Sequence, residues 1–221
     1  MLTTCVFALV VICAVLALGG TGMCTDGARL RERKWAQRGV RRQWATRVAD
    51  VPPLGDGGQV KLQGIAATDG GELRAPFSGR ACVAYELTLF DFEGVRPVLL
   101  ARETMAREFL LRDASGVAHV VPEPARIGIE PDKRWRFESL LQHADGRVAE
   151  LLRRHGLDAS HAGQPLVICE GVIAVGGAVA VLGRATREPD PAGGATPYRT
   201  LGTRPLVTGS AEAPLLLVAD E

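Results

Sequence analysis

Three side chains that could do chemistry, Ser78, Arg80 and Cys82, lie within five positions of one another in the string APFSGRACVAY at residues 75–85. A serine or cysteine becomes a nucleophile when a base activates it, and a nearby arginine can lower the pKa of a thiol. No Gly-x-Ser-x-Gly elbow surrounds Ser78, and a cysteine at the start of an apolar strand usually packs as a small hydrophobic residue. We therefore expect these three residues to form a ligand-binding turn, with a purely structural turn as the alternative.

The remaining motifs indicate no catalytic machinery. The chain has five cysteines and four histidines, but no Cys-x-x-Cys pair and no His/Cys spacing typical of a zinc site. Residues 171–183 are rich in glycine without matching a phosphate-binding loop. We expect Cys82 and Cys169 to be free thiols, with a disulfide between them as the alternative. The sequence thus predicts no metal, no cofactor and no enzymatic activity.

An uncharged, largely apolar stretch opens the chain, from Leu2 to Thr25. A bilayer core about 30 Å thick needs about 20 apolar helical residues to be crossed, so this stretch is long enough to span. A cleaved signal peptide would normally carry basic residues before its apolar core, and none is present here. We predict a transmembrane anchor over residues 1–25. The alternative is an exported envelope lipoprotein, cleaved before Cys24.

Basic and aromatic residues follow the apolar stretch, with only Asp26 and Glu32 as nearby acids. Loops rich in Lys and Arg beside a span stay on the cytoplasmic side. We therefore predict an outside N-terminus, a basic juxtamembrane helix over residues 26–50 and a cytoplasmic body at what we expect to be a bacterial inner membrane. The lipid bilayer is the expected partner, and no nucleic acid is expected. The residues predicted to contact the membrane surface are Arg29, Arg31, Arg33, Lys34, Trp35, Arg38, Arg41, Arg42 and Trp44.

The rest of the chain reads as short strands separated by turns. Residues 51–58 form a linker rich in proline and glycine, which places the start of the β-domain at residue 59 and its end at residue 221. Helical spacing predicts one helix near residues 145–155, and residues 135–141 read as irregular or as a first helical turn. Strands are predicted over residues 60–65, 81–92, 95–103, 108–111, 117–121, 166–170, 172–175, 178–185, 206–207 and 215–218. This pattern favours a mainly β fold, a small barrel or sandwich with one helical insertion.

The string at residues 75–85 resembles the signature of the GIDE domain, also called the "beside a membrane" (BAM) domain, of the MULAN-type mitochondrial E3 ubiquitin ligase family. Residues 108–125, with EFLLRDASG and then VVP, and residues 169–185, with CEGVI and then VLGRA, resemble later segments of that pattern in the same order. The resemblance covers about residues 58–219 and implies a module that lies beside a membrane. The RING finger and second span of those ligases are not found in this sequence, so ubiquitin transfer by this chain alone is not expected.

These features together predict a membrane-anchored, non-catalytic binding or sensing module. One alternative is the scaffold part of an E3 ubiquitin ligase-like or stress-response assembly whose catalytic part is another membrane or cytoplasmic protein. The exported envelope lipoprotein is the second alternative.

Overall fold

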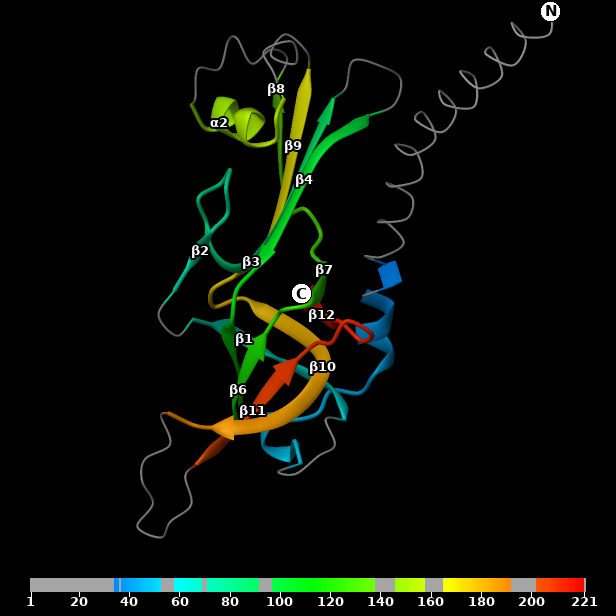
Figure 1. Cartoon of the computed structure of the whole chain (residues 1–221), viewed down its shortest axis with the longest axis vertical. Coiled ribbons are helices and arrows are strands. Elements are labelled where there is room, and N and C mark those ends of the chain that lie inside the picture. Colours follow the sequence, from blue (N-terminus) through cyan, green and yellow to red (C-terminus); the bar gives the residue numbers. More distant parts are fainter. Residues whose placement is uncertain are drawn as a thin grey trace, which may run out of the picture.

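The computed structural model describes residues 34–35, 37–52, 58–68, 71–91, 97–137, 146–157, 165–191 and 202–220. Within these ranges the chain forms two connected β-structures, a barrel in the lower half of Figure 1 and a second sheet above it. The predicted anchor at residues 1–25, together with Arg29, Arg31 and Arg33, lies outside the described residues. Among the helices that are described, none combines the length and the apolar character needed to cross a bilayer.

Five strands close the barrel: β1 (Gln59–Ala67), β5 (Phe109–Asp113), β6 (Gly116–Val121), β10 (Ala178–Pro189) and β11 (Thr203–Thr208). Their order is β1-β5-β6-β11-β10, and β10 pairs with β1 to complete the circle. All neighbours are antiparallel except β6 and β11, which are parallel. The predicted mainly β fold and its barrel are confirmed.

The connectivity of the barrel is that of a Greek-key closure. When its strands are numbered among themselves, the order is 1-2-3-5-4, returning to 1, with the third and fifth strands parallel. This is the strand order of the OB-fold. The fold by itself does not assign a ligand, because one fold hosts many functions.

The barrel strand β10 is buried on both faces, which explains its continuous apolar run. Val179 and Val181 point into the barrel core, as alternation along a strand requires. Ala180 and Leu182 point outward, lie beside Leu216 of the neighbouring strand, and pack together with it against Val40. The strand β12 (Leu215–Ala219) pairs with the edge of β10, and β7 (Ala125–Gly128) extends the sheet from β12.

The second sheet was not predicted as a separate unit. Its strands are β2 (Leu73–Arg74), β3 (Ala81–Asp91), β4 (Val98–Ala106), β8 (Lys133–Phe137) and β9 (Leu166–Ala174). The central pair is β3 and β9, with β8 beside β9 and with β2 and β4 beside β3. Because β2, β3 and β4 lie between barrel strands β1 and β5, and β8 and β9 lie between β6 and β10, this sheet is made of two insertions into the barrel.

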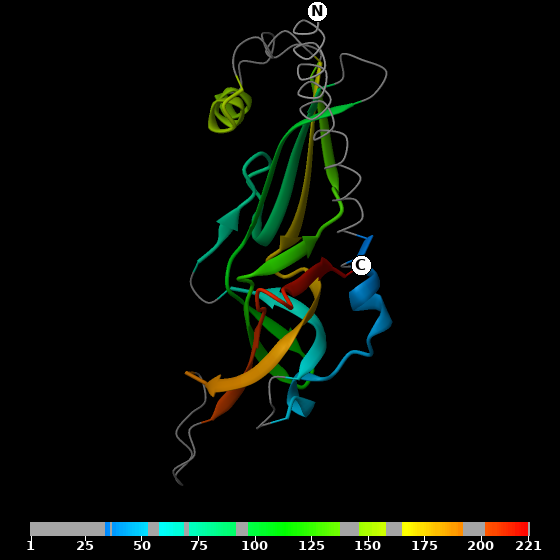
Figure 2. The ribbon, with the colours of Figure 1, turned by 45° about the vertical axis from the view of Figure 1, so that its right-hand side comes forward.

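Helix α2 (Gly146–Arg154) covers one face of the second sheet (Figures 1 and 2). Its buried residues Val148, Leu151 and Leu152 pack in one cluster with Leu87 and Leu89 of β3. The three helix residues recur at the spacing of one helical face, so burial of that face holds the helix in place. The predicted helix near residues 145–155 is confirmed.

Two strands of the second sheet show features that the sequence pattern did not predict. In β3, every residue from Cys82 to Leu89 is buried, because barrel, loops and helix together cover both faces. Residues 135–141 were expected to be irregular or a first helical turn, but residues 133–137 form β8, and residues 138–141 lie outside the described residues. The alternation of arginines with Trp135 and Phe137 in β8 is a strand period.

The predicted juxtamembrane helix over residues 26–50 is shorter in its described part. Residues 37–42 are helical, residues 44–47 are not, and a 3-10 turn, η1 (Val48–Asp50), follows. Of the predicted linker at residues 51–58, Val51, Pro52 and Gly58 are described, and Val51 is buried in the barrel cluster.

Candidate functional site

The turn that carries Ser78 and Arg80 is a tight loop between β2 and β3. The N–H of Ala75 donates to the carbonyl of Arg80 at 2.9 Å, and the N–H of Gly79 donates to the carbonyl of Ala75 at 2.9 Å. Gly79 has a φ of 70°, a left-handed conformation that glycine adopts without steric cost. Glycine therefore lets the chain reverse here and present Ser78 and Arg80 on the same side.

A fully buried carboxylate anchors this turn. Glu170 of β9 is 0% exposed, and its Oε2 accepts the backbone N–H groups of Phe77 at 3.0 Å and Ser78 at 3.2 Å. The Phe77 ring packs against Trp135 of β8 with the ring centroids 4.6 Å apart. The turn is thus fixed to the second sheet by polar contacts at its backbone and by aromatic packing at its side chain.

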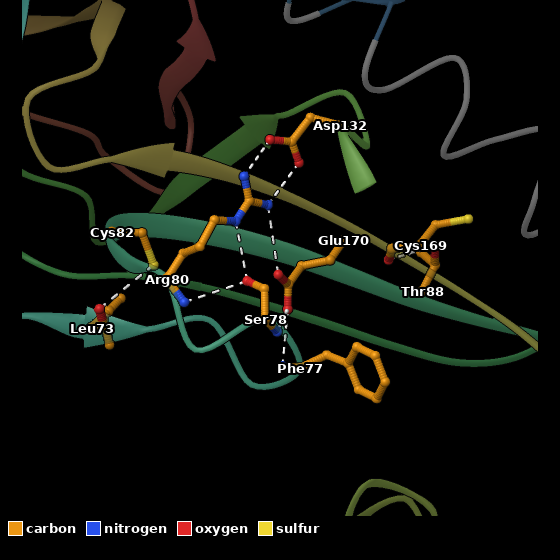
Figure 3. Close-up of polar contacts among 9 residues, drawn as sticks. All are labelled: Leu73, Phe77, Ser78, Arg80, Cys82, Thr88, Asp132, Cys169 and Glu170. Carbon is orange, nitrogen blue, oxygen red and sulfur yellow. Dashed lines mark hydrogen bonds and ion pairs between the residues drawn. The ribbon is translucent and has the colours of Figure 1, made fainter. Parts of the chain in front are cut away.

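Arg80 crosses from the turn to the loop before β8 (Figure 3). Its Nη2 donates to Oδ1 of Asp132 at 2.7 Å, and its Nη1 donates to the other carboxylate oxygen, so the pair is bidentate. Its Nε donates to Oγ of Ser78 at 3.1 Å, and Nη2 lies 3.6 Å from Oε1 of Glu170. The N–H of Asp132 in turn donates to the Glu170 carbonyl at 3.1 Å. One guanidinium therefore joins three separate segments of the chain.

The ionisation states follow from these contacts. The hydrogen bond from Arg80 lowers the pKa of Asp132, and the same bond raises the pKa of Arg80. Burial, with a further contribution from the Glu170 charge, raises the pKa of the Cys82 thiol to about 11 and outweighs the opposing effect of Arg80. At neutral pH the arginine and aspartate are charged, whereas Cys82 is a protonated thiol.

This arrangement positions the turn rather than activating a nucleophile. Ser78 Oγ accepts hydrogen bonds from Arg80, and no imidazole or carboxylate contacts Ser78 Oγ in the part of the chain that is described. Cys82 Sγ faces the carbonyl of Leu73 at 3.7 Å inside a buried cluster, away from the guanidinium (Figure 3). Cys82 and Cys169 are free thiols, as expected. Any ligand of Arg80 would have to compete with Asp132, whose side chain is about half exposed.

Sequence reasoning identified Ser78 and Arg80 but missed their partners Asp132 and Glu170. Both lie far away along the chain, and no motif links them to the turn. The one available signal was a charged residue, Glu170, inside the apolar strand at residues 166–174. A buried charge needs a partner, so that position predicts a polar contact without naming it.

The basic segment of residues 34–47 is docked on the outside of the barrel (Figure 2). Val40, which is buried, packs against the outward-facing residues of β10 and β12. The N–H of Thr46 donates to the carbonyl of Lys61 at 2.8 Å, and the Lys61 ammonium donates to the carbonyl of Gln43 at 3.2 Å. Beyond it, the N–H of Val48 donates to the carboxylate of Asp113 at 2.8 Å. The segment therefore has one defined position on the barrel.

All six predicted membrane-surface residues in this segment are exposed. Lys34, Arg38, Arg41 and Arg42 are exposed, and so is Trp35, over which the guanidinium of Arg126 lies 5.3 Å from the ring centroid. Trp44 is 95% exposed. A soluble surface rarely leaves an indole so free of contacts, whereas Trp is enriched where a protein meets a bilayer surface.

A second polar site lies on the outer face of the barrel over β5, β6 and β11. A pocket of about 530 Å³ opens there, and its charged lining residues are Arg107, Glu108, His119, Glu123 and Arg204. Sequence reasoning did not single out these residues, because they come from three separate segments that share no motif. Within the described residues, no group of three or more His, Cys, Asp or Glu side chains is arranged to hold a metal ion.

Comparisons of the chain with protein-family models, with curated proteins and with solved structures found no match. The resemblance to the GIDE domain stays a prediction.

Proposed function

We propose that the chain is a membrane-anchored, non-catalytic binding module whose β-body lies beside the cytoplasmic face of a membrane. The observation that carries the proposal is the exposed Trp44 beside Arg41 and Arg42, on a segment fixed to the barrel through Val40. Basic side chains near anionic lipid contribute about 1 kcal/mol each, and an interfacial Trp adds an apolar contact. The order of the GIDE-like strings, which fall on the β2–β3 turn, β5, β6, β9 and β10, supports the same proposal.

The non-catalytic part of the proposal rests on how the described reactive groups are used. Ser78 bonds to Arg80, and Cys82 is a buried, protonated thiol. His119 and His155 contact glutamates, and neither contacts a serine or cysteine within the described residues. A nucleophile needs an adjacent base or a lowered pKa, and neither condition is met by these groups.

Tryptophan quenching by brominated lipid tests contact between the basic segment and the membrane. The full chain is reconstituted in vesicles of anionic or zwitterionic lipid, with Trp35 and Trp135 replaced by phenylalanine so that only Trp44 emits. We expect quenching of Trp44 that is stronger in anionic than in zwitterionic vesicles. The matched control retains only Trp135, whose ring packs against Phe77 within the second sheet, and it should not be quenched.

If brominated lipid leaves the fluorescence of Trp44 unchanged, the proposed membrane contact is wrong. Orientation is tested separately with an alkaline phosphatase fused to the C-terminus in a bacterial host. The fusion should be inactive if the body is cytoplasmic, and an active fusion with intact protein contradicts the proposed side.

A further inference from the structure

The pocket on the barrel faces away from the basic segment. Its lining residues come from the outer faces of β5, β6 and β11 and from the segments that adjoin them. The basic segment covers β10 and β12, and β10 is separated from β5 by β1 and from β6 by β11. If the basic segment rests on lipid, the pocket opens to the aqueous side.

Two guanidinium groups in this pocket have nitrogens that bond to no other side chain among the described residues. Arg204 is 12% exposed, and its Nε donates to Oε1 of Glu188 at 2.6 Å. The same oxygen contacts Nδ1 of His119 at 2.9 Å, so Glu188 holds the side chains of both Arg204 and His119 in place. The terminal nitrogens of Arg204, and the whole guanidinium of Arg107, bond to no other described side chain. A planar guanidinium with free terminal nitrogens matches a carboxylate, which can accept two parallel hydrogen bonds.

Two carboxylates in the same pocket supply the opposite charge. Among the described residues, Glu123 forms no ion pair, and the charged contact of Glu108 is with the imidazole of His119, at 3.3 Å. A ligand that carries only a negative charge would be repelled by both of these carboxylates. A ligand that also carries an ammonium group satisfies them, which favours a molecule with both charges.

The pocket also offers apolar surface between its charged groups. Leu110 of β5 pairs with His119 of β6, and both point outward because their neighbours Phe109 and Val120 lie in the barrel core. Val121 and Pro122 complete this apolar part of the lining. A pocket of this volume and mixed lining is of the size that holds small ligands.

We propose that this pocket binds a small zwitterion of the amino-acid or short-peptide class. The ligand carboxylate lies on Arg107 and Arg204, its ammonium group lies on Glu108 and Glu123, and its apolar side chain lies over Leu110 and Val121. The inference deepens the proposed function, since it names a ligand class for the binding module.

The test uses the full chain in detergent micelles and isothermal titration with three probes. These are the dipeptide alanyl-valine with free termini, its N-acetyl form, which lacks the ammonium, and its C-terminal amide, which lacks the carboxylate. We expect the free dipeptide to bind and each blocked form to bind at least tenfold more weakly. Arg204→Gln and Arg107→Gln should bind the amide as tightly as they bind the free dipeptide. Glu123→Gln should likewise bind the N-acetyl form as tightly as it binds the free dipeptide.

Arg107→Gln is the informative variant, because the Arg107 guanidinium bonds to no side chain within the described residues, whereas Arg204 holds Glu188. Arg112→Gln is the matched control, since Arg112 is an exposed arginine of β5 outside the pocket. The inference is overturned if alanyl-valine gives no binding at millimolar concentration, or if Arg107→Gln and Arg112→Gln bind all three probes as the wild type does. Trp44→Ala should leave dipeptide binding unchanged, so failure of the ligand class and failure of membrane contact are separate results.

Discussion

Glu170 and Phe77 are 93 positions apart in the sequence, yet the buried carboxylate of Glu170 accepts the Phe77 N–H at 3.0 Å. Through this bond, and a second one to Ser78, a single side chain of β9 holds the turn from which β3 starts. A buried charge is costly unless it is paired and hydrogen-bonded, and here the backbone donors and the Arg80 guanidinium at 3.6 Å supply both conditions.

Replacing Glu170 should destabilise the fold in a graded way. Glu170→Ala leaves two backbone N–H groups without their acceptor and removes one of the contacts of Arg80, and we expect the free energy of unfolding to fall by about 3 kcal/mol. Glu170→Gln keeps an acceptor oxygen for Phe77 and Ser78, and the expected loss is about 1 kcal/mol. Urea unfolding of the full chain in micelles measures both. Equal losses for the two variants would show that the hydrogen bonds to the turn contribute little.

Close packing of β9 against the loop before β8 gives a second prediction. A Cβ at Gly171 would lie 2.4 Å from the carbonyl oxygen of Glu130 and 2.7 Å from a methyl carbon of Ile129. Neither atom can move far, because one is backbone and Ile129 is fully buried. We expect Gly171→Ala to lower the free energy of unfolding by about 2 kcal/mol or more, the usual effect of overpacking.

Gly58→Ala is the control for Gly171→Ala. A Cβ at Gly58 would meet nothing within 4 Å, so its effect on the free energy of unfolding should stay within about 0.5 kcal/mol. The interpretation of Gly171 as a close-approach position is wrong if the two variants unfold at the same urea concentration.

Some of this architecture could be predicted from the sequence. The parts that were not predictable have a common physical cause. The strand starting at Ala81 was predictable, because strand propensity and the turn residues before it act over a few positions. The partners Asp132 and Glu170 were not, because their pairing with Arg80 depends on how two insertions fold together. β8 was missed although Trp135 and Phe137 alternate with arginines, since five residues are too few for the period to be decisive.

Burial predicts that Cys82 reacts slowly with thiol reagents. With a pKa of about 11, roughly one thiol in a thousand is ionised at pH 8, against about a quarter for an ordinary cysteine. We expect alkylation of Cys82 by iodoacetamide, followed by peptide mass spectrometry, to be far slower than alkylation of the partly exposed Cys169. Faster labelling of Cys82 than of Cys169 at pH 8 would contradict this and would favour a reactive thiol in the turn.

Asp113 gives the stability a defined pH dependence. Burial raises the pKa of its carboxyl, but hydrogen bonds from Val48, Ser115 and Gly116 outweigh that effect, and the net pKa is lowered. A depressed folded-state pKa stabilises the fold above the unfolded value of about 3.9, and the stabilisation is lost as the pH falls through the folded pKa. Asp113→Asn should therefore lower the urea midpoint at pH 7 and change it much less near pH 3.

The control for Asp113→Asn is Asp50→Asn. The Asp50 side chain is 60% exposed and lies 3.8 Å from Arg47, a surface contact of the kind that contributes little. Its substitution should leave the urea midpoint nearly unchanged at both pH values. If Asp113→Asn lowered the midpoint equally at pH 7 and near pH 3, the effect would come from lost packing and not from the carboxylate charge.

In the basic segment, Val40 holds the chain on the barrel, whereas Trp44 faces outward. Substituting each residue in turn separates these two roles. Val40→Ala removes buried methyl groups that contact Ala180, Leu182 and Leu216, and we expect a loss of about 1–2 kcal/mol. Trp44→Ala removes an exposed ring and should change the free energy of unfolding by less than about 0.5 kcal/mol. With the segment loosened, trypsin should cut after Arg41 and Arg42 faster in Val40→Ala than in Trp44→Ala. Equal cleavage rates would mean that the hydrogen bonds from Thr46 and Lys61 hold the segment without Val40.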